Sequence, residues 1–337
     1  MKYLVTGSAG FIGFYVAKKL LEHGFNVVGI DNINDYYDVS LKQSRLNILK
    51  MFDNFSFYKI DISDKEKMAI LFKENKFDKV IHLAAQAGVR YSLINPFSYS
   101  ESNLTGFLTI LEGCRHNDIK HLIYASSSSV YGLNDTYPFS TNNSVDHPIS
   151  LYAATKKSNE LMAHSYSYLY NIPVTGLRFF TVYGPWGRPD MALFKFTNAI
   201  INEKPIDIYN NGEMSRDFTY IDDIVDGIYK VLSLPPKGNK LWKASSGILS
   251  TSSAPYQIYN IGNGKPISLM KYIESLEENL KIKAIKNYLP MQPGDVYKTY
   301  ADTNDLFEKT GYIPKTNIDD GIQKFVEWYK DFYKLSC

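Results

Sequence analysis

The sequence predicts an α/β fold in which a doubly wound parallel sheet of the Rossmann type carries a smaller mixed α/β substrate domain. Three observations predict it. A glycine-rich turn, from Gly7 to Gly13, separates a short apolar run from a helical pattern at the N-terminus. Apolar runs of strand length then alternate with helical patterns as far as residue 180. A tyrosine and a lysine, Tyr152 and Lys156, stand at helical spacing after a run of serines.

Composition narrows the class of protein. The chain has 337 residues, of which 45% are hydrophobic and 21% charged, which suits one large or two medium globular domains. A net charge of +2 with scattered lysines and arginines argues against nucleic-acid binding. No apolar run has the roughly 18 residues of a membrane span, and no signal peptide is recognisable, so we expect a cytoplasmic protein. The two cysteines and six histidines lack metal-ligand spacing, so no metal site is expected.

The first strand, residues 2–6, leads into the spacing Gly-x-x-Gly-x-x-Gly. Gly7 permits a tight turn, Gly10 lets backbone N–H groups approach a pyrophosphate, and Gly13 lets the next helix pack closely on the strand. Phe11 and Ile12 lie in the same turn and are expected to contact the dinucleotide. The alternative is a glycine turn without a ligand.

The second strand, residues 26–30, ends at Asp31 and Asn32. A carboxylate at this position accepts hydrogen bonds from ribose hydroxyls and repels a 2′-phosphate, so NAD is favoured over NADP. The third strand, residues 55–60, ends at Asp61 and Ile62. Asp61 either faces the adenine edge or caps a helix that begins near Ser63, and the sequence leaves both possibilities open.

The fourth strand, residues 79–83, ends in small residues that could let the chain pass under a dinucleotide. The cofactor contacts expected here are Leu83, Ala84, Ala85 and Gln86. The remaining pattern predicts helices at 96–115, 152–170, 221–232, 268–280 and 322–332, strands at 121–125, 174–179, 206–209 and 258–261, a turn at 212–217 and a loop at 235–255. We expect residues 1–180, with returning segments near 217–262, to form the cofactor domain, and residues 181–216 and 263–337 to form the substrate domain.

Tyr152 and Lys156 lie one above the other on a helix face. A phenol has a pKa near ~10 and is a poor base at neutral pH, but an ammonium group and an oxidised nicotinamide beside it both favour the phenolate. Tyr152 would then be the acid/base and Lys156 would lower its pKa. Taken alone, the spacing is better explained as a solvated helix face, because a chain with 27 tyrosines contains such a spacing by chance.

Together, the glycine turn, the serine run and Tyr152-x-x-x-Lys156 resemble the extended short-chain dehydrogenase/reductase family over essentially the whole chain. Local strings are most similar to the UDP-glucuronate 4-epimerases of that family. These strings are residues 31–38, 82–92, 187–192 and 291–296.

The resemblance implies NAD retained through the cycle, with Asn103 and Phe179 near it, a UDP-sugar held by the C-terminal region, and a homodimer formed through the helices around 100 and 160. Arg216 stands where the family has a diphosphate-binding arginine. Gln292 replaces a second cation of the hexose epimerases, which leaves the diphosphate contacts there uncertain. The other substrate contacts implied are Arg90, Ser127, Ser128, Ser129, Thr181, Arg188, Ala192, Tyr209 and Asp295.

The serine run distinguishes sister reactions that share oxidation at C4. A 4,6-dehydratase needs a positioned acid and base, which are an Asp-Glu pair at the positions of Ser128 and Ser129, and a decarboxylase has Glu at the position of Ser129. This chain offers hydroxyls only, which favours 4-epimerisation, with Ser127 on O4 beside Tyr152. The alternatives are epimerisation of a neutral UDP-hexose or UDP-N-acetylhexosamine, a UDP-glucuronate decarboxylase or a dehydratase, and a silent NAD-binding regulatory protein. Serines after a strand can also be turn formers.

A uronic acid oxidised at C4 is a β-keto acid, so its carboxylate must be held out of alignment with the carbonyl to avoid decarboxylation. Ser128, Ser129 and Thr181 are the expected donors, and Arg90 and Arg188 are candidate cations. The alternatives are a solvated loop charge for Arg188 and a structural ion pair for Arg90.

Overall fold

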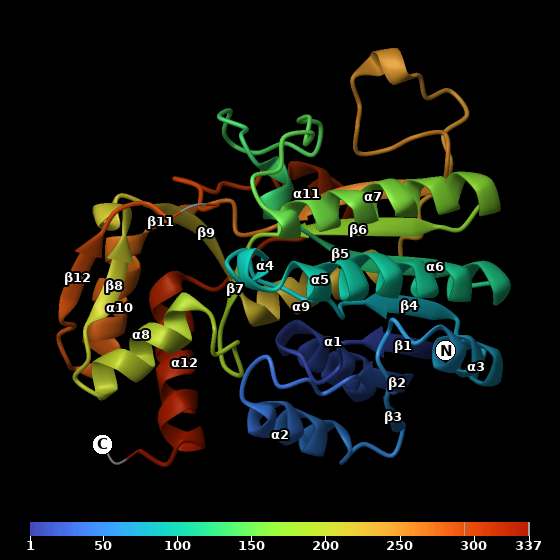
Figure 1. The fold of residues 1–337 in the computed structure, drawn as a ribbon. Helices are drawn as coiled ribbons and strands as arrows, with labels where there is room; N and C mark the ends of the chain where they lie inside the picture. The colour runs from blue at the N-terminus through green and yellow to red at the C-terminus, as the bar shows by residue number, and fades with distance from the viewer. Residues whose placement is uncertain (293, 336–337) are drawn as a thin grey trace.

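The computed structural model describes residues 1–292 and 294–335. Its main sheet has seven parallel strands in the order β10-β6-β5-β4-β1-β2-β3 (Figure 1). The strand bounds are β1 Lys2–Thr6, β2 Asn26–Asp31, β3 Phe55–Lys59, β4 Lys79–His82, β5 His121–Ser127, β6 Val174–Phe179 and β10 Tyr256–Ile261. The chain runs outward from β1 to β3 and then restarts at β4 on the other side of β1, so a ligand crevice is expected between the carboxyl ends of β1 and β4.

Helices cover both faces of this sheet. One face packs on α1 (Phe11–Glu22), α2 (Val39–Leu49) and α9 (Ile221–Leu232), and the other on α3 (Lys65–Asn75), α6 (Gly106–His116) and α7 (Leu151–Tyr170). The apolar run of β1 is continuous because the strand is buried on both faces of the sheet. Tyr3 and Val5 belong to the core cluster on one face, and Leu4 belongs to the cluster on the other. A strand buried on both faces needs apolar residues at every position. The fold class predicted from the sequence is therefore confirmed.

The C-terminal region carries two small sheets, seen at the left of Figure 1. In one, β9 (Ser215–Tyr220) pairs in parallel with β7 (Thr181–Tyr183) and antiparallel with β11 (Pro266–Ser268). In the other, β8 (Ile206–Tyr209) pairs in parallel with β12 (Lys286–Leu289). The helices of this region are α8 (Ala192–Ile201), α10 (Leu269–Leu280) and α12 (Ile318–Phe332). Ser268 caps α10 by accepting a hydrogen bond from the Lys271 N–H, as its place before the helical pattern predicts.

The remaining helices are short. They are α4 (Tyr91–Ile94), α5 (Pro96–Tyr99), a π-helical turn η1 (Ser100–Thr105), 3-10 turns η2 (Ser128–Tyr131), η3 (Asn210–Gly212) and η4 (Ala244–Ser246), and α11 (Asn304–Thr310). Apart from η4, the stretch 235–255 is irregular, as expected, and it projects from the body of the protein in Figure 1. Across the described residues, no helix is long and apolar enough to cross a membrane.

One local prediction was wrong. Residues 212–217 do not form a single turn, because β9 begins at Ser215 and places Arg216 on a strand. The partners of β9 are β7 and β11, which are distant in sequence, so the hydrogen bonds that fix this strand leave no local signal.

Candidate active site

The glycine turn forms a close-packed cradle at the start of α1. Gly7 has a φ of +71°, and a side chain there would meet the backbone of Ala84 at 2.9 Å. A Cβ at Gly13 would lie 2.0 Å from the Gly7 carbonyl oxygen, so only glycine lets α1 approach the turn. The first turn of α1 contains no acidic residue, which leaves its N–H groups available to an anion. These features fit the pyrophosphate of a dinucleotide.

Asp31 ends β2 and lies over this turn. Its carboxylate accepts hydrogen bonds from the Ala9 N–H at 3.2 Å and the Ile33 N–H at 2.9 Å. Burial raises the pKa of Asp31, and these backbone bonds oppose the rise. Each carboxylate oxygen retains lone pairs that could accept from a ribose hydroxyl.

Asp61 lies next to the Asp31 end of the cleft, because Asn32 donates to its carboxylate at 2.7 Å. The alternative that Asp61 caps the following helix is wrong: α3 begins at Lys65, and its cap is Asp64, which accepts from the Lys67 N–H. Asp61 instead accepts from the backbone and hydroxyl of Ser63 within a turn. The adjacent Ile62 is buried in the core against Gly106.

The segment after β4 crosses the cleft from the other side. Both Leu83 and Ala84 donate their N–H groups to the Thr6 hydroxyl at 3.1 Å, and Ala85 and Gln86 follow. The side chain of Asn103 makes two hydrogen bonds to the backbone of Gln86, at 2.9 and 3.0 Å. The Gln86 side-chain nitrogen is buried without a hydrogen-bond partner, as expected of a group that meets a bound cofactor.

Lys156 is buried beneath the cleft on α7, with 3% of its surface exposed. Its ammonium group donates to the Ala125 carbonyl oxygen at 2.9 Å. Burial lowers the pKa of Lys156 to about 8. The helix begins one residue before Tyr152 because Ser150 caps it by accepting from the Ala153 N–H at 3.1 Å.

Tyr152 lies one turn above Lys156 and beside Ser127, at the end of β5. Burial raises the pKa of the Tyr152 phenol, while a hydrogen bond with Ser127 and the charge of Arg188 oppose the rise. The Ser127 hydroxyl also accepts from the Ser129 N–H at 3.2 Å, at the start of η2, which holds Ser128 and Ser129 next to it. The structure thus brings Tyr152, Lys156 and Ser127 together, and lowering of the phenol pKa by Lys156 stays a prediction.

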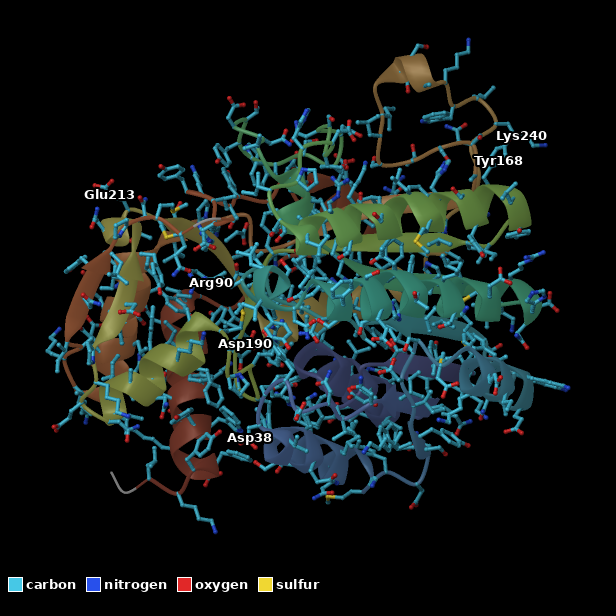
Figure 2. All side chains as sticks on the ribbon, in the orientation of Figure 1. Asp38, Arg90, Tyr168, Asp190, Glu213 and Lys240 are labelled. Atoms are coloured by element: carbon cyan, nitrogen blue, oxygen red, sulfur yellow. The ribbon has the colours of Figure 1, made fainter. Side chains whose placement is uncertain are left out.

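Arg188 lies near the phenol and is paired. Its guanidinium makes a two-point ion pair with Asp190, which also accepts from the Tyr36 hydroxyl at 3.2 Å. The expectation of a solvated loop charge is therefore wrong for Arg188. Asp190 lies at the centre of the molecule in Figure 2, where the C-terminal region faces the main sheet.

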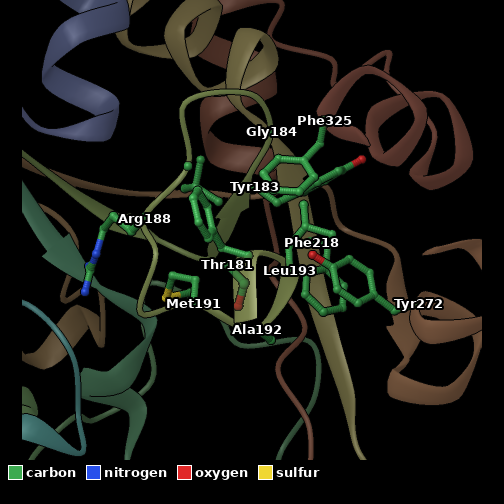
Figure 3. Close-up of a pocket in the computed structure, with 13 residues that line it drawn as sticks. Thr181, Tyr183, Gly184, Arg188, Met191, Ala192, Leu193, Phe218, Tyr272 and Phe325 are labelled. Atoms are coloured by element: carbon green, nitrogen blue, oxygen red, sulfur yellow. The ribbon is translucent and has the colours of Figure 1, made fainter. Parts of the chain in front are cut away.

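A pocket lies behind this arginine (Figure 3). Thr181, Ala192 and Arg188 line one part of it, and four aromatic rings, those of Tyr183, Phe218, Tyr272 and Phe325, line the other. Phe218 and Tyr272 are stacked, with ring centroids 4.1 Å apart. In the close-up the Arg188 guanidinium points away from these rings.

The remaining candidates come from the segment after β4, from the end of β6 and from the C-terminal region. Arg90 donates to the Asp295 carboxylate at 3.1 Å and stacks over Tyr209 at 4.5 Å, which is the structural ion pair considered for it. Arg216 donates to the Ser215 and Tyr297 carbonyl oxygens, and its charge lies near Asp295. The Gln292 carbonyl oxygen accepts from the Asp295 N–H at 3.2 Å. Phe179, the last residue of β6, is 8% exposed at the end of the sheet.

Sequence reasoning missed Arg45, which is fully buried on α2. It donates to the Ala9 carbonyl oxygen at 2.8 Å and to the Trp186 carbonyl oxygen at 2.6 Å, so it joins the glycine turn to the loop that carries Arg188. A signal was available, because Arg45 stands midway between Leu41 and Leu49 on the buried stripe of its helix. An arginine on such a stripe needs partners inside the protein. The described residues contain no cluster of side chains that could hold a metal ion.

Comparisons with known proteins agree with this geometry. The model of the NAD dependent epimerase/dehydratase family matches residues 3–262. The probable UDP-glucuronate 4-epimerase of Rhizobium meliloti is 48% identical over 99% of this chain and 98% of its own, and protein CapI of Staphylococcus aureus is 56% identical over 99% of this chain and all of its own. The crystal structure of UDP-glucuronic acid 4-epimerase from Bacillus cereus, in complex with UDP-glucuronic acid and NAD, superposes with a TM-score of 0.87 at 34% identity, covering 99% of this chain and all of the other. This chain belongs to the NAD dependent epimerase/dehydratase family.

Proposed function

We propose that this protein is an isomerase that converts UDP-glucuronate to UDP-galacturonate by epimerisation at C4, with NAD as its cofactor. The observation that carries the proposal is the Ser127 hydroxyl beside Tyr152, followed in the chain by two further hydroxyls, those of Ser128 and Ser129. These hydroxyls offer partners for the sugar but no acid or base for an elimination. The relatives described above that carry a functional name are UDP-glucuronate 4-epimerases.

The residues that would hold NAD line both sides of the glycine turn. Gly7, Gly10, Phe11, Ile12 and Gly13 would meet its pyrophosphate, and Asp31 with Asn32 its adenosine ribose. The other cofactor contacts are Asp61, Ile62, Leu83, Ala84, Ala85, Gln86, Asn103, Tyr152, Lys156 and Phe179. Bound NAD supplies the redox chemistry of the reaction, taking hydride from C4 and returning it to the opposite face.

Tyr152 is the acid/base of the proposed reaction. It takes the proton of the 4-hydroxyl during oxidation and gives it back during reduction, and Ser127 shares that proton through its hydrogen bond to the phenol. Lys156 lies one turn below and carries a positive charge at neutral pH, because its pKa of about 8 is still above 7. That charge favours the phenolate and positions the ribose of the nicotinamide.

The substrate carboxylate would be held by polar side chains from the start of η2 and from the segment after β6. Ser128, Ser129 and Thr181 would donate to it, and Arg188 would supply a cation whose direction is fixed by Asp190. With the C5–carboxylate bond held near the plane of the ketone at C4, out of alignment with the carbonyl π system, the carboxylate would not leave as carbon dioxide. Ala192, Tyr209, Arg216, Asp295 and Arg90 would meet the UDP end.

The larger organisation of the protein is also part of the proposal. Residues 1–180 with the segments near 217–262 would form the cofactor domain, and 181–216 with 263–337 the domain for the nucleotide sugar. Two copies would associate through the helices around 100 and 160. A cytoplasmic location stays a prediction, and a place in polysaccharide synthesis is added to the proposal.

The test is to incubate the purified protein with UDP-glucuronate, without added NAD, and to identify the products by NMR. We expect UDP-galacturonate and no lasting 4-keto sugar or pentose. Tyr152→Phe should lower the rate by roughly 10²–10⁴, the usual contribution of a general base. A variant with near wild-type turnover would contradict the role of Tyr152.

One observation favours a second candidate, a 4-epimerase of a neutral UDP-hexose or UDP-N-acetylhexosamine. Arg188 is already paired with Asp190, so binding a sugar without a carboxylate would not leave the Arg188 charge without a partner. Parallel assays with UDP-glucose and UDP-N-acetylglucosamine separate the two, since the proposal requires the higher kcat/KM for UDP-glucuronate.

A further inference from the structure

A buried ion pair lies beneath the helix that carries Tyr152. Glu160 on α7 and Arg178 on β6 are 4% and 3% exposed. Two parallel hydrogen bonds join them, from Arg178 Nε to Glu160 Oε1 and from Nη2 to Oε2, both at 2.9 Å. Such two-point pairs fix the relative orientation of both side chains, in addition to bringing opposite charges together.

This ion pair reaches the catalytic strand through Ser126. The Ser126 hydroxyl donates to Glu160 Oε1 at 2.6 Å, and Ser126 directly precedes Ser127 on β5. Ser126 and Arg178 are also register partners on neighbouring strands. Arg178 is held on its outer side by Tyr131, to whose hydroxyl it donates at 3.1 Å.

Glu160 also lies in line with the catalytic residues of α7. It stands four residues after Lys156 and eight after Tyr152, so all three fall on neighbouring turns of one helix face. Glu160 therefore links α7, which carries Tyr152, to β5, which delivers Ser127, in addition to the link that Lys156 makes to Ala125. Figure 1 shows α7 lying along β6 and β5.

A buried ion pair is weak evidence of stability, because removing two charges from water offsets much of their attraction. Its directional hydrogen bonds, in contrast, restrict how α7 can shift against the strand ends. Proton transfer between the substrate hydroxyl, Ser127 and Tyr152 depends on such positions, and a misplacement of about 1 Å can lower a rate about a hundredfold.

We propose that Glu160 is a positioning residue for this reaction: held by Arg178, it binds Ser126 and so sets the place of the Ser127 hydroxyl relative to the Tyr152 phenol. This role rests on the proposed epimerase function. It assigns Glu160 and Arg178 no contact with the sugar or the cofactor.

The first test removes the hydrogen bond between Ser126 on β5 and Glu160 on α7 and leaves the bond from Lys156 to the Ala125 carbonyl oxygen in place. In Ser126→Ala, kcat for UDP-glucuronate should fall by about tenfold while KM changes by less than about twofold, because the loss falls on the reacting groups. The bound NAD per protomer should stay at the wild-type value. Tyr131→Phe is the matched control, since it removes a hydrogen bond from Arg178 but leaves the bonds of Glu160 intact, and it should keep the wild-type kcat.

The second test separates positioning from stability. In the double variant Glu160→Leu/Arg178→Met, both charges are removed together, a change that often leaves stability unaltered. We expect a Tm within a few degrees of wild type and a kcat lowered by about a hundredfold. A merely structural role predicts that the folded double variant works normally.

The outcomes distinguish the two proposals. If the wild-type protein does not epimerise UDP-glucuronate, the proposed function is overturned, and the positioning role with it. If the wild type is active but Ser126→Ala keeps its kcat, or loses no more than Tyr131→Phe does, the positioning role alone is overturned.

Discussion

At the scale of single residues, the site contains charged groups whose burial is unfavourable. Hydrogen bonds inside the protein offset part of the free-energy cost of that burial. Lys156 is the clearest case. Burial lowers its pKa from an ordinary value of 10.5 to about 8, and the Ala125 carbonyl oxygen is its hydrogen-bond acceptor. Such a group is present for its chemistry, since an apolar side chain would fill the same space without the penalty.

Lys156→Met should therefore make the protein more stable and inactive. Below pH 8 the lysine is charged in both folded and unfolded chains, and the full penalty of burial applies. It is on the order of 3 kcal/mol for a lowering from 10.5 to about 8, and loss of the bond to Ala125 offsets part of it. We expect a net gain of about 1–2 kcal/mol at pH 7 in urea unfolding of protein freed of NAD.

The stability gained by Lys156→Met should depend on pH. Between pH 8 and 10.5 the unfolded chain binds a proton that the folded chain has released, so wild-type stability rises with pH over this window relative to the variant. The advantage of Lys156→Met should shrink accordingly by pH 10. Lys157→Met, which changes the partly exposed neighbour, is the control and should shift stability by no more than about 0.5 kcal/mol at either pH. An advantage that is constant with pH would contradict the buried charge.

The carboxylate pocket gives a second prediction at this scale. Thr181→Ala and Ser128→Ala should each weaken selectivity for UDP-glucuronate over UDP-glucose by roughly 1–3 kcal/mol, the worth of a hydrogen bond to a charged group. Each should also release UDP-pentose, because a carboxylate that is free to rotate is lost from a β-keto acid. NMR of the products gives the rate of epimerisation of each sugar nucleotide and hence the selectivity, mass spectrometry detects the pentose, and the exposed Thr136→Ala is the control. Unchanged selectivity without pentose would mean that other residues hold the carboxylate.

At the scale of helices and strands, many elements with a local apolar pattern were predictable, although α8 was missed despite its stripe of buried residues. The bounds of β1, β6 and α9 agree with the sequence because each is set by its own buried residues. The strand β12 was missed since it has no alternation of apolar residues and exists by pairing with β8, which lies far back in the chain. The same reason limits how much of the site the sequence predicts. The glycine turn and the Tyr152 motif are local in sequence. Arg90 and Asp295, in contrast, are 205 residues apart in the chain and come together only in the folded protein.

The cap of α10 tests the local part of this account. Ser268→Ala should lower the free energy of unfolding by about 1 kcal/mol, because the Lys271 N–H loses its acceptor at the helix start. The exposed Ser253→Ala, in an irregular segment, should change it by less than about 0.5 kcal/mol. Denaturant unfolding of both variants gives the comparison, and equal values would show that the cap bond contributes nothing.

At the scale of the whole molecule, the active site lies where separate parts of the chain meet. Arg45 connects α2 to the loop before α8, and the Arg90–Asp295 pair connects the segment after β4 to the C-terminal region. No single segment contains the site. The sequence could therefore predict which motifs take part, while their distances depend on the packing of the complete protein.

Exposed apolar side chains on α5 and α7 support the prediction that the protein is a homodimer. Phe97 on α5 is 83% exposed and Leu161 on α7 is 58% exposed, and the two helices are neighbours in Figure 1. Large apolar side chains gathered on one face are typical of a covered surface, and a twofold axis would bring each face onto its copy.

Analytical ultracentrifugation at micromolar concentration measures this association. The wild type should sediment as a dimer and Phe97→Asp/Leu161→Asp as a monomer, because burying two carboxylates per copy costs far more than the lost apolar contact. Met51→Asp is the matched control: this methionine is 82% exposed, but it lies just after α2, on the opposite face of the main sheet from α7, so the dimer should persist. A wild type that is monomeric, or a double variant that remains dimeric, would mean that these helices do not form the interface.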